Sequence, residues 1–170
     1  MNLPFKYLSK SSAETEQKAE EFASIVSCGD FILLKGRLGA GKTKFVSGLA
    51  KYFCYAKNTN IVTSPTFSLM NRYFCAQAQH NKEIIIDHFD FYRLKNLYDL
   101  ENSGFFDSLS SNDTLTIAEW GDKIGFDYTN IIKNYYFEVN ITADDADGES
   151  TTDNLCREII IEKIIINNNK

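Results

Sequence analysis

Hydrophobic residues follow two spacings along this chain: short continuous runs, and positions three or four residues apart. The run Phe31-Ile32-Leu33-Leu34 is apolar throughout, which is typical of a strand buried on both faces, and residues 114–120 have a similar character. Residues 42–53 instead place apolar side chains on one helical face, at Phe45, Val46, Leu49, Ala50 and Phe53. The pattern therefore predicts strands that alternate with amphipathic helices.

Caps and turns predict further elements. Ser11-Ser12-Ala13-Glu14 has the form of a capping box, which predicts a helix that begins there and ends at Cys28-Gly29. Extended segments are predicted at residues 61–73, 83–89, 135–142 and 155–164, and a short helix at residues 97–102. The remaining polar segments are predicted to be a hairpin turn at 77–82, a flexible acidic hairpin loop at 143–154 and a polar tail at 167–170.

The residues after the first apolar run carry a motif for binding phosphate. Gly36 to Thr43 has the spacing G-x-x-x-x-G-K-[ST], in which backbone N–H groups surround the phosphates, the lysine reaches the outer phosphates and the threonine ligates magnesium. Because the loop also opens a helix, the positive end of the helix dipole faces the anion. The motif predicts a nucleoside triphosphate site formed by Gly36, Leu38, Gly39, Ala40, Gly41, Lys42, Thr43 and Lys44.

The order of these elements predicts the fold class. A buried strand, a phosphate-binding loop, a helix and later strands are the parts of a three-layer α/β P-loop NTPase fold, with the nucleotide at the carboxyl ends of parallel strands. The hairpins require some antiparallel pairing, so the central sheet is predicted to be mixed and mostly parallel. Residues 1–170 are predicted to form a single domain of this kind.

Two carboxylates at predicted strand ends could complete a magnesium-dependent site. Glu119 ends the strand at 114–120, where P-loop proteins hold magnesium beside the loop threonine; the alternative is an exposed glutamate. Asp90, in the segment His88-Phe89-Asp90-Phe91-Tyr92-Arg93, could orient water or lie behind the metal ligands. The alternative is an ordinary structural cluster in which Asp90 pairs with Arg93 while His88 and Tyr92 hydrogen-bond in the core.

A polar interruption, Ser64-Pro65-Thr66-Phe67, follows the loop helix in the sequence. Nucleotide switches of P-loop proteins often occupy this position and respond to the γ-phosphate, so Thr66 is a candidate sensor. A plain proline turn is the alternative on local grounds.

Composition and charge narrow the classes of function. The 170 residues are 44% hydrophobic, which is enough for one compact core, and no apolar run is long enough to cross a membrane, so we expect a soluble cytoplasmic protein. A formal charge of −5 argues against a broad basic surface for nucleic acid, so any contact with RNA is expected to be indirect. Four cysteines without C-x-x-C spacing, Cys28, Cys54, Cys75 and Cys156, favour buried free thiols over metal ligands.

Four motifs together resemble the TsaE family, bacterial ATPases of tRNA threonylcarbamoyladenosine biosynthesis. They are the Gly36 to Thr43 loop, Ser64-Pro65-Thr66-Phe67, His88-Phe89-Asp90-Phe91-Tyr92-Arg93-Leu94 and Glu119-Trp120, in the order and spacing of that family. The loop alone is widespread, whereas the combination is specific. The resemblance covers about residues 11–157.

This resemblance implies an ATPase that uses ATP and Mg²⁺. Its family assists transfer of a threonylcarbamoyl group onto the adenosine next to the anticodon in tRNAs that read codons beginning with A. The implied partners are TsaD and TsaB, whose complex performs the transfer and is reset by the ATPase step, so tRNA is contacted only indirectly. By analogy, Lys42 binds phosphate, Thr43 and Glu119 hold magnesium, Asp90 supports hydrolysis, Trp120 lies near the nucleotide, and Ser11 and Ser12 contact the adenine side.

One loop position departs from the family, and two rival functions stay open. Arg37 stands where an acidic residue is usual, which predicts altered partner contacts or surface charge rather than lost ATP binding. A small-molecule P-loop kinase would close an arginine-bearing lid over the phosphates, but no arginine lies between Asp99 and Asn134. The other rival is a nucleotide-dependent binding module that does not hydrolyse ATP.

Overall fold

The structure, a computed structural model, describes residues 3–54, 62–76, 83–143 and 156–165. These residues form a seven-stranded sheet of order β1-β7-β6-β2-β5-β4-β3. The strands are β1 (Phe5–Ser9), β2 (Phe31–Lys35), β3 (Met70–Ala76), β4 (Glu83–Asp90), β5 (Thr114–Glu119), β6 (Tyr136–Ala143) and β7 (Arg157–Ile164). The helices are α1 (Ser12–Ala23), α2 (Lys42–Phe53), α3 (Leu97–Glu101), α4 (Phe105–Ser110) and the 3₁₀ turns η2 (Gly121–Ile124) and η3 (Tyr128–Asn130).

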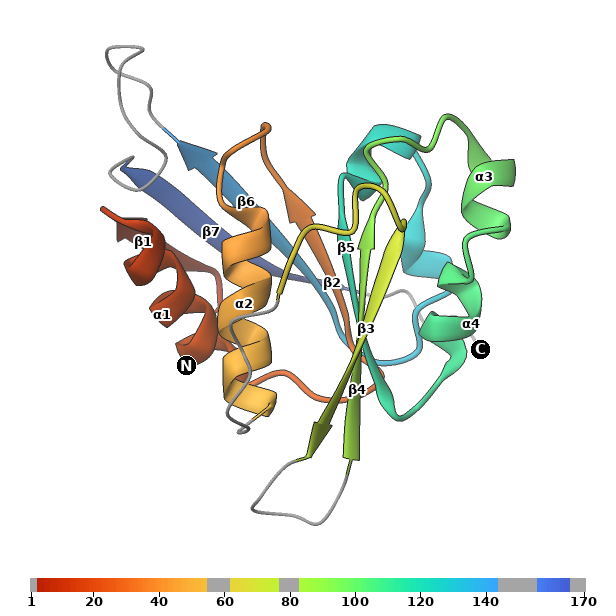
Figure 1. The fold of residues 1–170 in the computed structure, drawn as a ribbon, viewed down its shortest axis with the longest axis horizontal. Coiled ribbons are helices and arrows are strands. Elements are labelled where there is room, and N and C mark those ends of the chain that lie inside the picture. The colour runs from red at the N-terminus through yellow and green to blue at the C-terminus, as the bar shows by residue number, and fades with distance from the viewer. Residues whose placement is uncertain (1–2, 55–61, 77–82, 144–155, 166–170) are drawn as a thin grey trace.

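The centre of the sheet is parallel. Strands β6, β2, β5 and β4 run in one direction, and their carboxyl ends meet at the top of the molecule in Figure 1. Strand β7 is antiparallel to β6, β1 is antiparallel to β7, and β3 is antiparallel to β4. The prediction of a mixed, mostly parallel sheet is confirmed.

Helices cover both faces of the sheet (Figure 1). On β2, Ile32 and Leu34 join the core beneath α1 and α2, whereas Phe31 and Leu33 join the core on the side of α3, α4 and the 3₁₀ turns. Successive side chains of a strand point to opposite faces, so a run that is apolar at every position has to be covered twice. The three predicted layers are therefore present.

Several predicted boundaries are wrong. Helix α1 ends at Ala23 rather than at Cys28-Gly29, because the Ser24 backbone N–H and hydroxyl both turn back onto the carbonyl of Glu21. Between residues 62 and 69 the chain forms loop and turn instead of strand, and β3 begins only at Met70. Strand β1 and helix α4 were not predicted. Both hairpins are confirmed by strand pairing, but the turn at 77–82, residues 144–154 of the acidic loop and the tail at 167–170 lie outside the described residues.

The expectation of buried free thiols is wrong for three of the cysteines. Cys54, which follows α2, and Cys75, in β3, form a disulfide with their Cα atoms 4.3 Å apart. Cys156 is free but exposed. The sequence spacing of cysteines does not reveal that β3 packs against the end of α2, which is what brings the first two together. Among the described helices, none combines the length and the hydrophobicity needed to cross a membrane.

Candidate functional site

The glycine-rich loop connects the carboxyl end of β2 to the first residue of α2, at the edge where the parallel strands end (Figure 1). Gly41 precedes α2 with a φ of 108°, a conformation that only glycine adopts without strain. No described side chain caps this helix at Gly41. The first N–H groups of α2 therefore point out of the helix without a side-chain acceptor, which suits the binding of an anion.

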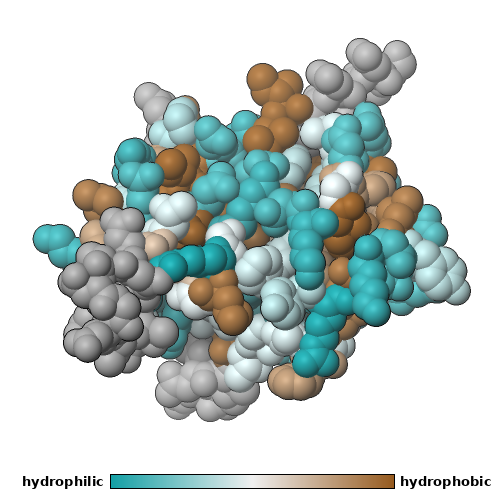
Figure 2. Space-filling model, turned by 90° about the horizontal axis from the view of Figure 1, so that it is seen from above, coloured by the Kyte–Doolittle hydropathy of each residue, from teal (hydrophilic) through white to brown (hydrophobic). Residues whose placement is uncertain are grey.

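A cavity of about 390 Å³ lies beside this loop. Segments distant in the sequence converge on it: the start of α1, the loop, residues 64–66, the ends of β4 and β5, and the start of β7. Its lining residues are Ser12, Leu38, Gly39, Gly41, Lys42, Thr43, Lys44, Ser64, Thr66, Asp90, Tyr92, Glu119, Trp120 and Arg157. On the face of the molecule that is seen from above in Figure 2, hydrophobic residues form small separate groups among hydrophilic ones.

Lys42 bends back over its own loop. Its Nζ donates to the carbonyls of Gly36 at 2.8 Å and Arg37 at 2.9 Å, and lies 3.7 Å from the centre of the Trp120 ring. Burial lowers the pKa of Lys42, while Glu119 and other nearby carboxylates act in the opposite direction. A phosphate oxygen could replace the two carbonyls, because it is a stronger acceptor for an ammonium group.

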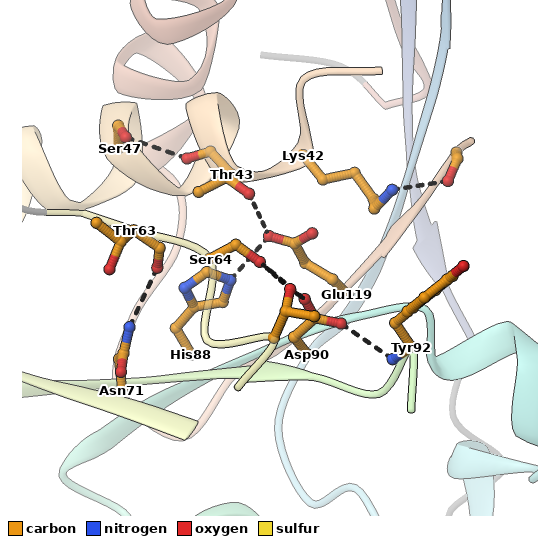
Figure 3. A network of polar contacts seen from close by, with 12 residues as sticks. Lys42, Thr43, Ser47, Thr63, Ser64, Asn71, His88, Asp90, Tyr92 and Glu119 are labelled. Atoms are coloured by element: carbon orange, nitrogen blue, oxygen red, sulfur yellow. Dashed lines mark hydrogen bonds and ion pairs between the residues drawn. The ribbon is translucent and has the colours of Figure 1, made fainter. Parts of the chain in front are cut away.

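Glu119 lies between the loop helix and the sheet (Figure 3). Its Oε1 atom accepts a hydrogen bond from Thr43 Oγ1 at 2.9 Å and lies 2.9 Å from His88 Nε2. The side chain is buried, because β5 runs between β2 and β4 with Glu119 level with Leu34 and Asp90. The alternative of an exposed glutamate at a strand end is therefore wrong.

Asp90 is engaged on both carboxylate oxygens. Oδ2 accepts from the Ser64 hydroxyl at 2.8 Å and from the Thr66 hydroxyl, and Oδ1 accepts from the Tyr92 backbone N–H at 2.9 Å (Figure 3). Among the ion pairs of the described residues, none joins Asp90 to Arg93, whose guanidinium lies 4.4 Å from the centre of the exposed Phe67 ring. The alternative of an Asp90–Arg93 pair is wrong, and the candidate sensor Thr66 is instead bound to the candidate catalytic carboxylate.

Trp120 completes a stack of cations and aromatic rings at the cavity wall. Its backbone has a φ of 65°, which is rare for a residue other than glycine. Its ring has the Lys42 ammonium nearby and the Tyr92 ring at 5.1 Å, and the Lys123 ammonium in turn lies 4.7 Å from the centre of the Tyr92 ring. The residue directly after Glu119 is thereby held against both the loop lysine and the end of β4.

Comparison with known proteins assigns the family. The family model described as "Threonylcarbamoyl adenosine biosynthesis protein TsaE" matches residues 9–152. This chain belongs to the TsaE family. The TsaE protein of Rickettsia prowazekii (strain Madrid E) is 40% identical over 114 residues, 67% of this chain and 72% of the relative. That of Aquifex aeolicus (strain VF5) is 40% identical over 94 residues, 55% of this chain and 65% of the relative.

A solved structure supports the same fold. The crystal structure of Bacillus subtilis YdiB matches with a TM-score of 0.63 and 21% sequence identity, covering 99% of this chain and 89% of that one. At this identity the match concerns the fold alone. The three-layer α/β fold with a mixed, mostly parallel sheet, predicted from the order of elements, is therefore confirmed.

In this TsaE-family protein, most predicted nucleotide contacts lie at the cavity. Three do not line it: Gly36 provides a carbonyl to Lys42, Ala40 is a buried residue of the loop, and the Ser11 hydroxyl caps α1 by accepting from the Glu14 N–H at 3.1 Å. Ser12 does line the cavity. The contacts of these residues with a nucleotide remain predictions.

Three lining residues were missed. Ser64 and Tyr92 lie inside motifs that the sequence does display, but Arg157 has no local signal. Strand β7 brings Arg157 to the loop, where its buried Nε donates to the carbonyl of Ala40 at 3.0 Å. Arg157 lies outside the segment between Asp99 and Asn134 that has no arginine. An arginine bonded to the loop backbone also differs from one carried by a mobile lid.

The oxygen atoms of Thr43 and Glu119 fit a magnesium ion. Mg²⁺ usually takes one or two protein oxygen ligands and completes its shell with phosphate and water. Among the described residues there is no cluster of three or more His, Cys, Asp or Glu side chains that would make a metal site from protein alone. The donor set thus suits a cation shared with a phosphate rather than a structural metal.

Proposed function

We propose that this protein is a slow, Mg²⁺-dependent ATPase required for threonylcarbamoyl modification of the adenosine next to the anticodon in tRNAs that read A-starting codons. The observation that carries the proposal is the Thr43–Glu119 hydrogen bond at the start of α2, beside the Lys42 ammonium. Two side-chain oxygen atoms and one ammonium group thus lie at the start of a helix, which is where a triphosphate would bind in this proposal. Membership of the TsaE family supports the tRNA pathway.

Each residue has a role in this proposal. Lys42 exchanges the Gly36 and Arg37 carbonyls for phosphate oxygens, and Thr43 and Glu119 hold Mg²⁺, which neutralises phosphate charge when bound. Asp90 accepts a hydrogen bond from the attacking water and orients it once Ser64 and Thr66 leave Oδ2. Loss of these two hydroxyl contacts couples the position of residues 64–66 to the presence of the nucleotide.

The proposed partner is the TsaD–TsaB complex. A chain with a net charge of −5 is poorly suited to neutralise tRNA phosphates, so action through partner proteins explains a tRNA pathway better than direct contact does. Stimulation by the complex would also explain why Asp90 is engaged by Ser64 and Thr66 in the isolated chain.

The test combines binding with single-turnover chemistry. Calorimetry should give a Mg²⁺-dependent heat for ATP, and phosphate release should be slow for the protein alone and faster with TsaD–TsaB. No heat with ATP or GTP would contradict the whole proposal. Binding without phosphate release, alone or with the complex, would make the protein a nucleotide-dependent binding module. Transfer of the γ-phosphate to a small acceptor would make it a kinase.

A further inference from the structure

His88 lies on the sheet side of the Thr43–Glu119 pair (Figure 3) and is completely buried. It belongs to β4, pairs in register with Ile117 of the neighbouring strand β5, and precedes Asp90 by two residues, so its side chain emerges on the same face of the sheet. His88 has no part in the roles proposed above for the carboxylates and the lysine of the site.

In the hydrogen bond between His88 and Glu119, only the histidine can be the donor. A carboxylate oxygen can only accept, so in the contact with Glu119 Oε1 the imidazole donates from Nε2. The other ring nitrogen, Nδ1, has no hydrogen-bond partner among the described residues, which fits a lone pair better than a buried N–H. His88 therefore has one polar contact in the described structure, and it is with Glu119.

Among the residues that the structure describes, Glu119 has two side-chain partners of different kinds. Thr43 lies in the first turn of α2, next to Lys42, whose contacts change when an anion replaces its two carbonyl acceptors, whereas His88 is fixed in the central sheet. The contact with His88 can persist in both states. An imidazole buried for packing alone would lose hydration without compensation, so its single hydrogen bond to the carboxylate indicates a positioning role.

We infer that His88 is a positioning residue, whose Nε2–H holds Glu119 Oε1 next to Thr43 so that the divalent-cation site is formed before the nucleotide arrives. This inference rests on the proposed function, in which Thr43 and Glu119 hold Mg²⁺. It predicts that His88 affects the coupling between Mg²⁺ and ATP rather than the affinity for ATP alone.

The experiment measures the dissociation constant of ATP by calorimetry in excess Mg²⁺ and in EDTA. The constant in EDTA divided by the constant in Mg²⁺, called the ratio below, reports how strongly Mg²⁺ favours ATP binding. His88→Leu removes the N–H and fills the position with an apolar side chain. The ratio should then fall about 10- to 100-fold, as for loss of other groups that orient metal ligands. The constant in EDTA should stay unchanged. His88→Gln, which can place an N–H near Nε2, should recover most of the ratio, and the shorter His88→Asn should not.

Two controls separate positioning from damage to the fold. Ile86→Ala alters the buried residue two positions earlier on the same face of β4, and it should lower stability without changing the ratio. In a Glu119→Gln background, His88→Leu should have no further effect on the ratio. Should the leucine variant not fold, the glutamine–asparagine comparison carries the same test.

The outcomes distinguish the inference from the function on which it rests. A wild-type ratio that persists in His88→Leu, or that falls equally in His88→Gln and His88→Asn, overturns the role of His88 alone. A wild-type protein that binds ATP equally well in Mg²⁺ and in EDTA overturns the proposed metal site and the inference together.

Discussion

The two candidate carboxylates, Glu119 and Asp90, differ in how they are held. Glu119 contacts the sheet through His88 and the loop through Thr43, whereas Asp90 contacts residues 64–66 and the backbone N–H of Tyr92. A carboxylate that must accept a hydrogen bond from water has to be released first, but one that ligates a cation benefits from being held. The contacts therefore support different roles for the two residues.

Lys42 should contribute chiefly to affinity. Lys42→Ala should weaken Mg-ATP binding about 10- to 100-fold, since a hydrogen bond to a charged group contributes roughly 1.5–3 kcal/mol. Calorimetry measures the effect, with Lys133→Ala, an exposed lysine outside the cavity, as the control. Unchanged affinity in the Lys42 variant would exclude a contact between this ammonium and the phosphates.

Asp90 should contribute chiefly to rate. Asp90→Asn keeps the shape of the side chain, so the ATP dissociation constant should change less than about 3-fold while phosphate release slows about 10²- to 10⁴-fold, the range typical of a lost general base. Asp107→Asn, an exposed change on α4, is the matched control. An equal loss of ATP affinity would refute the assigned role.

Helices α1 and α2 position the loop by packing closely. At Gly48 of α2 an added Cβ would lie 2.1 Å from the carbonyl oxygen of Glu16 and 2.7 Å from the Cβ of Ala19. Lys51 of α2 reaches Glu16 of α1 across the same contact, at 3.3 Å. Since α2 begins at Lys42, the separation of the two helices also sets where the loop residues lie.

Gly48→Ala should therefore destabilise the protein, although alanine favours helices over glycine by about 1 kcal/mol. The added methyl group has to push the helices apart, and overpacking of this kind costs about 1–3 kcal/mol. The free energy of unfolding in urea measures it. Ser47→Ala, one residue earlier on α2, adds no volume and should change stability by less than about 0.5 kcal/mol. Equal stability of Gly48→Ala and wild type would mean that the helices do not touch here.

The elements that the sequence predicts well are those with local signals. The buried run of β2, the glycine spacing and the apolar face of α2 are adjacent in the chain, so β2, the loop and α2 were all predicted within a residue. Residues 62–69 were misjudged because their hydroxyl groups bond to Asp90, 24 and 26 positions later. Arg157 and the Cys54–Cys75 disulfide were missed for the same reason, since sequence periodicity carries no information on contacts across the sheet.

At the scale of the whole molecule, charge limits the partners. The chain carries 23 acidic and 18 basic residues, and the face in Figure 2 mixes hydrophilic and hydrophobic groups. Binding to tRNA depends largely on neutralising phosphates. A role in tRNA modification through other proteins is consistent with this balance.

The isolated protein should therefore bind tRNA weakly, with a dissociation constant above about 10⁻⁵ M near physiological salt, in the range of non-specific contacts. Fluorescence anisotropy with labelled tRNA at several salt concentrations measures it, and the same titration with TsaD–TsaB present is the comparison. Tight binding by the protein alone that weakens steeply with salt would contradict indirect action.

Trp120 is the single tryptophan of the chain, and the Lys42 ammonium lies over its ring. The emission of an indole depends on charges close to it, so movement of this ammonium onto an arriving polyphosphate changes the light that the protein emits. Occupancy of the site can consequently be followed in real time with unlabelled nucleotide and unmodified protein. Every substitution described above except Lys42→Ala, which removes the ammonium itself, leaves both groups of that optical signal in place.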